Sequence, residues 1–174
     1  NTKRLLDQYE VNGVFARDQE TRSANGQISK FLRQAKAGEY ISIQAYLPYD
    51  EDTAEQLEKL RTAVRDRVGV PVTIGYGPRF LHSTGQLHKG GANNVVALQL
   101  TYDCAQELLI AGEPYSFGTV IRAQSLGDFE SLQAHDRRVM RIHLGNDVSA
   151  GLKKVIKAAS GAARKPRAAG ANKK

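Results

Sequence analysis

The chain has 174 residues, enough for one ordinary domain with a hydrophobic core and too few for two full domains. No apolar run approaches the roughly 18 residues that a membrane helix needs, and the single cysteine, Cys104, excludes an internal disulfide and a cysteine-based zinc cluster. The net charge of +7 comes from residues 151–174, which hold eight Lys and Arg and no Asp or Glu, so the remainder is close to neutral. We therefore expect a cytoplasmic protein with no membrane partner, and, because the chain begins with Asn1, a segment of a longer one.

Helices and strands are predicted to alternate along the first half of the chain. The apolar residues of 28–36 recur at helical spacing, and residues 39–47 are apolar at nearly every position, which predicts a helix and then a strand covered on both faces. Thr53 is placed to cap a long helix that Gly69 ends. Residues 70–76 follow as a second strand.

The same alternation continues through the second half. The glycine-rich residues 75–91 are expected to open a short helix, and residues 94–101, rich in Val and Leu, form a third strand. Apolar spacing over 115–133 predicts another helix, which Gly127 is expected to break. A further strand at 138–144 completes the sheet.

A last helix over 148–159 leads into a basic tail. We expect disorder over residues 158–174, because their Ala, Gly, Lys and Arg bury too little apolar surface to offset the loss of backbone entropy. The alternation predicts an α/β fold with three layers, a mostly parallel sheet flanked by helices, in which ligands bind at the carboxyl ends of the strands. We place one domain at 1–150 and the helix end and tail at 151–174.

The segment that carries chemistry is residues 75–91, which holds two histidines, an arginine, a lysine and several hydroxyl and amide side chains. Its glycines let the backbone approach an anion, so a phosphate group is the expected ligand. Nucleotide binding is disfavoured because the segment has neither a Gly-Lys-Ser/Thr phosphate loop nor a G-x-G-x-x-G motif. Arg79 and Lys89 have charges suited to phosphate.

Two histidines in this segment, His82 and His88, are six residues apart, and no carboxylate lies between Arg79 and Gly91. This pattern disfavours a zinc site, so we predict no metal and no other cofactor. An imidazole can transfer a proton near neutral pH, as the ring opening of a sugar requires. The sequence leaves open whether each histidine acts on a ligand or has a structural role.

Two short strings resemble one family. Residues 81–86, Leu-His-Ser-Thr-Gly-Gln, resemble the L-H-S-x-G-Q element of bacterial phosphoglucose isomerases, and residues 115–118, Tyr-Ser-Phe-Gly, are similar to the Y-[ST]-F-G that opens a later helix there. Residues 75–91 resemble more specifically the C-terminal isomerase region of bifunctional transaldolase/phosphoglucose isomerases, over most of 1–145. The resemblance implies a sugar-isomerase (SIS) type of fold and the isomerisation of glucose 6-phosphate and fructose 6-phosphate without a metal or redox cofactor.

In this interpretation His82 is catalytic and assists ring opening. The substrate-binding residues are Arg79, Ser83, Thr84, Gln86 and Lys89. The family's enediol-forming glutamate has no counterpart in residues 61–77, and its F-D-Q-P lysine segment does not follow residue 118. We therefore expect the chain to be incomplete alone, with a sugar phosphate and the remainder of the parent enzyme as partners, and a homo-oligomer is compatible with this.

The alternative is a non-catalytic sugar-phosphate-binding or scaffold domain of the same enzyme, which the missing glutamate favours. Nucleic-acid binding through residues 151–174 is disfavoured, because they contain no aromatic side chains interleaved with the basic ones.

Overall fold

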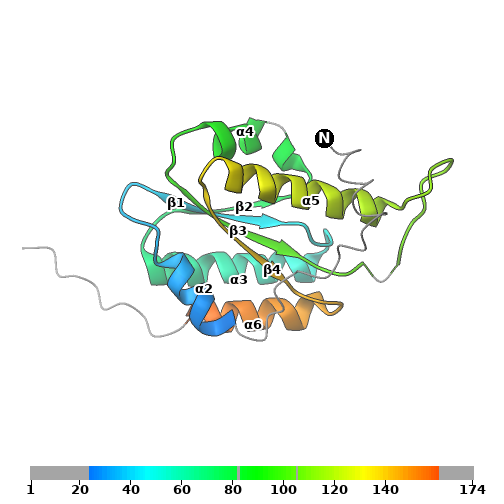
Figure 1. The fold of residues 1–174 in the computed structure, drawn as a ribbon. Helices are drawn as coiled ribbons and strands as arrows, with labels where there is room; N and C mark the ends of the chain where they lie inside the picture. The colour runs from blue at the N-terminus through cyan, green and yellow to red at the C-terminus, as the bar shows by residue number, and fades with distance from the viewer. Residues whose placement is uncertain (1–23, 82, 105, 161–174) are drawn as a thin grey trace, which may run out of the picture.

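The computed structural model describes residues 24–81, 83–104 and 106–160, which form a four-stranded parallel sheet with helices on both faces (Figure 1). The strands are β1 (Tyr40–Ala45), β2 (Val72–Tyr76), β3 (Val95–Thr101) and β4 (Arg138–His143), in the order β2-β1-β3-β4. The helices are α2 (Ala24–Leu32), α3 (Glu51–Val68), α4 (Ser83–Gly90), α5 (Phe117–Ala134) and α6 (Val148–Ser160), and the 3₁₀ turn η2 (Arg79–Leu81) precedes α4. The predicted α/β fold with a parallel sheet between two helical layers is confirmed.

The ends of the long helix α3 follow from local hydrogen bonding. Asp50, rather than the predicted Thr53, is the N-cap, and its carboxylate accepts a hydrogen bond from the Thr53 backbone N–H at 2.8 Å. The negative charges of Glu51 and Asp52 in the first turn also stabilise the helix, because they lie at the positive end of its dipole. Gly69 ends α3 as predicted, with the left-handed φ of 77° that glycine adopts without steric cost.

Two other predicted boundaries are wrong. Helix α5 begins after the N-cap Ser116 and continues through Gly127 without a break, since one glycine inside a helix costs only about 1 kcal/mol relative to alanine. Buried residues on both sides, Ala123 and Leu132, hold it in place. Helix α2 ends at Leu32 rather than at Lys36.

The two faces of the sheet differ in chemistry. On one face, alternate strand residues such as Ile43, Leu98 and Ile142 pack in a large apolar core with α2, α3 and α6, below the sheet in Figure 1. The residues between them point to the opposite face, which α4 and α5 cover. The side chains on that face are largely polar: Tyr40, Ser42, Gln44 and Tyr46 from β1 and the residue after it, Gln99 and Thr101 from β3, and Arg141 and His143 from β4.

Helix α6 belongs to the apolar core. Its side chains Leu152, Val155 and Ala159 are buried against the sheet side that α3 also covers, so the folded unit extends past residue 150, where the sequence suggested a boundary. The disorder predicted from residue 158 is therefore wrong for residues 158–160, because these complete α6. The rest of that prediction, residues 161–174, lies outside the described residues.

No helix in the described ranges is long and apolar enough to cross a membrane.

Candidate functional site

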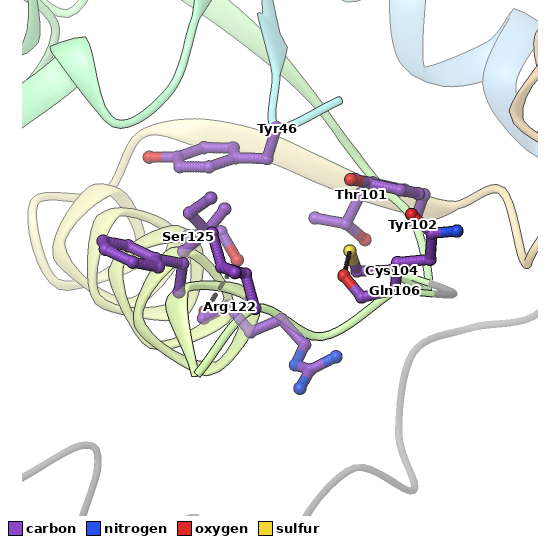
Figure 2. A pocket seen from close by; sticks show the side chains of 11 residues that line it. Tyr46, Thr101, Tyr102, Cys104, Gln106, Arg122 and Ser125 are labelled. Atoms are coloured by element: carbon purple, nitrogen blue, oxygen red, sulfur yellow. Dashed lines mark hydrogen bonds between the residues drawn. The ribbon is translucent and has the colours of Figure 1, made fainter. Parts of the chain in front are cut away.

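The sheet has a topological switch point between β1 and β3. From β1 the chain leads to β2 on one side, whereas β3 lies on the other side and is followed by β4. In parallel sheets of this type, ligands bind outside the carboxyl ends of the strands at this point, because the connections diverge there and leave a crevice. A pocket of about 150 Å³ occupies this position, between Tyr46 after β1, Thr101 at the end of β3 and the first turns of α5 (Figure 2).

The pocket has an apolar wall and a polar wall. Leu108, Phe117 and Ile121 form the apolar wall, and all three are exposed large hydrophobic residues. The polar wall includes Thr101 and Ser125. The lining is mostly apolar with a few placed hydroxyl groups, which suits a small organic ligand, since apolar contacts give affinity and the hydroxyls give orientation.

A polar cluster at the start of α5 closes one end of this pocket. Glu107 accepts hydrogen bonds from the Ser116 hydroxyl and, at 2.7 Å, from Nη2 of Arg122, which also lines the pocket. The bond from Ser116, supported by the one from Arg122, lowers the pKa of Glu107 below its usual value. A Cβ on Gly118 would lie 2.5 Å from this carboxylate, so a larger residue there would displace the carboxylate from its present position.

The cluster explains the string at 115–118 in physical terms. Ser116 caps α5 by accepting a hydrogen bond from the Thr119 backbone N–H at 3.1 Å, and Gly118 makes room for Glu107. This string therefore shapes the pocket that α5 lines.

Behind the pocket wall, a buried ionic network joins three elements. Asp128 on α5 is 1% exposed and accepts hydrogen bonds from the Tyr46 hydroxyl and from the ammonium group of Lys89 on α4. Burial, together with the negative charge of Asp128, raises the pKa of Tyr46 far above its ordinary value, so Tyr46 remains a protonated donor. The network fixes α4 and α5 to the polar face of the sheet.

The polar face also contains groups that the protein leaves incompletely bonded. Gln44 and Gln99 are partners in the β1–β3 register and both are fully buried. Within the described part of the chain, the side-chain carbonyl oxygens of both have no hydrogen-bond partner. Each such group costs about 1–3 kcal/mol, so this face is not optimised for stability alone.

The predicted site residues that the structure describes all lie on η2 and α4, but their exposure differs. Arg79, Ser83, Thr84 and Gln86 are exposed on η2 and α4, and none of them is among the described residues that line the pocket. His82, the predicted catalytic residue, lies outside the described residues. Lys89 has a side chain that is 15% exposed and is engaged by Asp128, which gives it a structural role; its role as a phosphate ligand stays a prediction.

Of the two roles that the sequence left open for His88, the structure supports the structural one. It is 2% exposed, and its Nδ1 lies 3.3 Å from Nε2 of Gln44. Burial lowers its pKa, with Lys89 acting in the same direction and Asp128 against it, so the buried ring is held neutral.

The predicted segment adjoins the pocket through Tyr46. The Phe80 ring lies 5.9 Å from the Tyr46 ring, centroid to centroid, and a Cβ on Gly77 would come within 2.2 Å of the Tyr46 ring. A Cβ on Gly85 would lie 1.4 Å from the Phe80 carbonyl oxygen. Both glycines are therefore needed for close packing of η2 and α4 beside the pocket wall.

Sequence reasoning missed most of the residues that form the pocket and its support, namely Tyr46, Thr101, Glu107, Ser125 and Asp128. Among the described residues, no group of three or more His, Cys, Asp or Glu is placed to hold a metal ion.

Comparisons with known proteins give the fold and no function. No family model and no curated protein matches the sequence. A solved structure, a hypothetical protein from Thermus thermophilus, has a similar fold, with a TM-score of 0.66 and 13% sequence identity. The similarity covers 79% of this chain and 39% of that one, so this chain spans about two fifths of the longer protein.

Proposed function

We propose that this chain is the sugar-phosphate-binding part of an aldose–ketose isomerase that interconverts glucose 6-phosphate and fructose 6-phosphate, with an SIS-like fold and as the C-terminal region of a transaldolase/glucose-6-phosphate isomerase. One observation carries the proposal. The two strings that resemble the isomerase family, residues 81–86 and 115–118, are far apart in sequence, yet they open α4 and α5, which contact each other and cover the same polar face of the sheet.

Both helices begin at the carboxyl edge of the sheet, where ligands bind in this class of fold. In the proposed complex, the hydroxyl oxygens of Thr101 and Ser125 accept hydrogen bonds from sugar hydroxyls in the pocket. The Ser125 hydroxyl already donates its proton to the Arg122 carbonyl oxygen at 2.8 Å and accepts from Arg141 at 2.7 Å, so it binds the ligand only as an acceptor. Arg79, Ser83, Thr84 and Gln86, exposed at η2 and the start of α4, bind the phosphate or the open-chain oxygens, and His82 assists ring opening.

A second candidate function is that this chain alone binds the sugar phosphate and does not isomerise it. This candidate is favoured by the hydrogen bonding of the two carboxylates near the pocket. Glu107 is engaged by Ser116 and Arg122, and Asp128 is buried and engaged by Tyr46 and Lys89. Neither carboxylate is therefore placed to abstract a proton from carbon in the pocket. In the proposed enzyme, the enediol-forming base comes from the rest of the parent protein or from another subunit.

Calorimetric titration with 6-phosphogluconate, an analogue of the open-chain sugar phosphate, tests the proposal. We expect the chain to bind the analogue, Ser125→Ala and His82→Ala to weaken binding at least tenfold, and His135→Ala to leave it unchanged. His135 is a suitable control because it is exposed at the C-terminal end of α5, away from the pocket. Absence of binding by the unmodified chain would leave only a scaffold role.

Conversion of fructose 6-phosphate, followed in a coupled assay, separates the two candidates. If the chain binds 6-phosphogluconate but does not convert fructose 6-phosphate, the result supports a binding domain. Conversion by this chain alone would show that it contains the enediol-forming base.

A further inference from the structure

Three side chains near the carboxyl ends of β3 and β4 form a hydrogen-bonded series, of which the proposed function uses only Thr101, as a ligand contact. Thr101 and His143 are register partners on these strands, so both point to the polar face. The Thr101 hydroxyl oxygen lies 3.1 Å from Nδ1 of His143. Nε2 of the same ring lies 3.1 Å from a carboxylate oxygen of Asp103.

The hydrogen-bonding abilities of these groups fix the direction of the series. A carboxylate only accepts, so Nε2 of His143 holds the proton and donates it to Asp103. Nδ1 of the neutral ring is then the acceptor, and the Thr101 hydroxyl donates to it. The Thr101 oxygen keeps its lone pairs for a group in the pocket, which Thr101 lines.

Solvent exposure increases along the series. Thr101 is 5% exposed, the His143 side chain is 16% exposed and the Asp103 side chain is 54% exposed. The three groups thus connect the pocket with bulk water by way of an imidazole. A hydroxyl, an imidazole and a carboxylate in this order are the arrangement by which proteins withdraw a proton from a reacting group.

We propose that Thr101, His143 and Asp103 form a proton relay that deprotonates a hydroxyl group of the ligand in the pocket. The ligand O–H bond breaks and its proton goes to the Thr101 oxygen, while the original Thr101 hydroxyl proton moves to Nδ1 of His143. The products are a ligand alkoxide and an imidazolium ion, which the Asp103 carboxylate stabilises.

The inference rests on the proposed function, and in that setting the hydroxyl is the anomeric one. Its alkoxide becomes the carbonyl of the open-chain sugar as the bond from the anomeric carbon to the ring oxygen breaks. The ring oxygen takes a proton from a water molecule. The hydroxide ion that this leaves takes up, through solvent on the Asp103 side, the proton that His143 gained, so the relay is restored without another reactant.

Ring opening can be measured separately from isomerisation, because it interconverts the α and β anomers and needs no carbon base. We would follow anomer exchange of glucose 6-phosphate by NMR with the 174-residue chain and with His143→Gln, Thr101→Val and Thr101→Ser. The relay requires the first two variants to lose about 100-fold in the catalysed rate, as expected for loss of general acid–base catalysis, and Thr101→Ser to keep most of it. The affinity of His143→Gln and Thr101→Ser for 6-phosphogluconate stays within a few-fold of that of the unmodified chain.

Matched controls are present in the chain. His135→Gln removes an exposed imidazole outside the pocket, and Thr73→Val makes the same isosteric change on the edge strand β2. Both should keep the full rate. If Thr101 and His143 only stabilise the pairing of β3 and β4, Thr101→Val and His143→Gln should lose stability but keep an unchanged rate of anomer exchange per folded molecule.

The possible outcomes separate the inference from the function on which it rests. Binding without catalysed anomer exchange, or equal rates in the unmodified chain and His143→Gln, would overturn the relay and leave the sugar-phosphate site. Absence of binding would overturn both. As a check without ligand, ¹⁵N NMR of the His143 ring should show the proton on Nε2, and a proton on Nδ1 would reverse the direction of the series and refute the relay.

Discussion

At the scale of single residues, Asp128 joins the two helices of the polar face to the sheet through Tyr46 and Lys89. Removing one partner of a buried ion pair leaves an uncompensated charge and typically costs about 3–5 kcal/mol. Lys89→Met should therefore lower the free energy of unfolding by about 3 kcal/mol, measured by urea denaturation. Asp128→Asn added to Lys89→Met should recover part of this loss, because no charge then remains buried and the asparagine oxygen still accepts from Tyr46.

Lys59→Met is the matched control for this prediction. Lys59 pairs with Glu55 on the surface of α3, with side chains 58% and 66% exposed, so its loss should change stability by less than about 0.5 kcal/mol. Equal decreases in the free energy of unfolding for Lys89→Met and Lys59→Met would show that the buried ion pair stabilises the fold no more than the exposed one.

His88 gives the protein a specific pH dependence. Burial lowers its pKa in the folded state, whereas in the unfolded chain a histidine titrates near 6.5. Between these two values the unfolded state binds more protons, so stability is retained above about pH 6.5 and falls as the pH decreases below it, by up to about 1.4 kcal/mol per unit. Urea denaturation at about pH 7.5 and about pH 5.5 should show this loss.

The same loss should be smaller in His88→Gln, which can still bond Gln44 but does not ionise. Glu39 and Glu107 do not obscure the comparison. Their pKa values are lowered from 4.5, so their contributions are lost only at more acidic pH. An equally steep loss in His88→Gln would mean that another group titrates in this window.

At the scale of elements, the position of α4 depends on Gly85. Any Cβ there would overlap the Phe80 carbonyl oxygen, a backbone atom that cannot turn aside. Gly85→Ala should lower the free energy of unfolding by about 1–3 kcal/mol, since overpacking forces η2 and α4 apart. Gly90→Ala, in the same helix but with nothing within 4 Å of the added Cβ, should be neutral or slightly stabilising.

Thermal denaturation of both variants measures the difference. A loss for Gly85→Ala no larger than for Gly90→Ala would show that α4 adjusts freely. Binding of 6-phosphogluconate should weaken in Gly85→Ala alone, because the start of α4 carries the predicted phosphate ligands.

The sequence predicted the order and type of these elements well, because each one has a local signal. The apolar stripe of α3, the αL residue Gly69 and the Val- and Leu-rich β3 are visible within a few residues. The cap at Asp50 was missed because Asp and Thr are both good caps and only the backbone geometry selects one. The helix break expected at Gly127 was wrong because burial of the neighbouring residues outweighs the weak helix propensity of glycine.

The site was predicted less completely, for a different reason. The β1 region alternates between Ile and polar residues, with Tyr40, Ser42, Gln44 and Tyr46 on one face, and this period-two signal was present but was interpreted as a uniformly apolar strand. The pairs Lys89–Asp128 and Thr101–His143 carry no such local signal. They join residues 39 and 42 positions apart, and only the tertiary fold brings them together.

At the scale of the whole molecule, the two helical layers have different sources of stability. The layer of α2, α3 and α6 shares the large apolar core with the sheet. On the other face, the apolar cluster of α5 consists of buried Ala123 with Tyr115 and Leu126 packed against it. The helices α4 and α5 are held to the sheet by this cluster, by other buried apolar side chains such as Leu132, and by the side-chain hydrogen bonds to Asp128.

This asymmetry predicts that the polar layer opens before the apolar one. Native-state hydrogen exchange should show amides of α4 and α5 exchanging at a lower opening free energy than those of β1, β3 and α6, because a segment with few buried apolar contacts unfolds locally at less cost. Adding 6-phosphogluconate should raise protection in α4 and α5 and leave α6 unchanged, since a ligand in the pocket between Tyr46 and α5 stabilises only the closed layer. Equal opening free energies in both layers would show instead that the molecule unfolds as one unit, and that the carboxyl edge of the sheet is rigid before any ligand arrives.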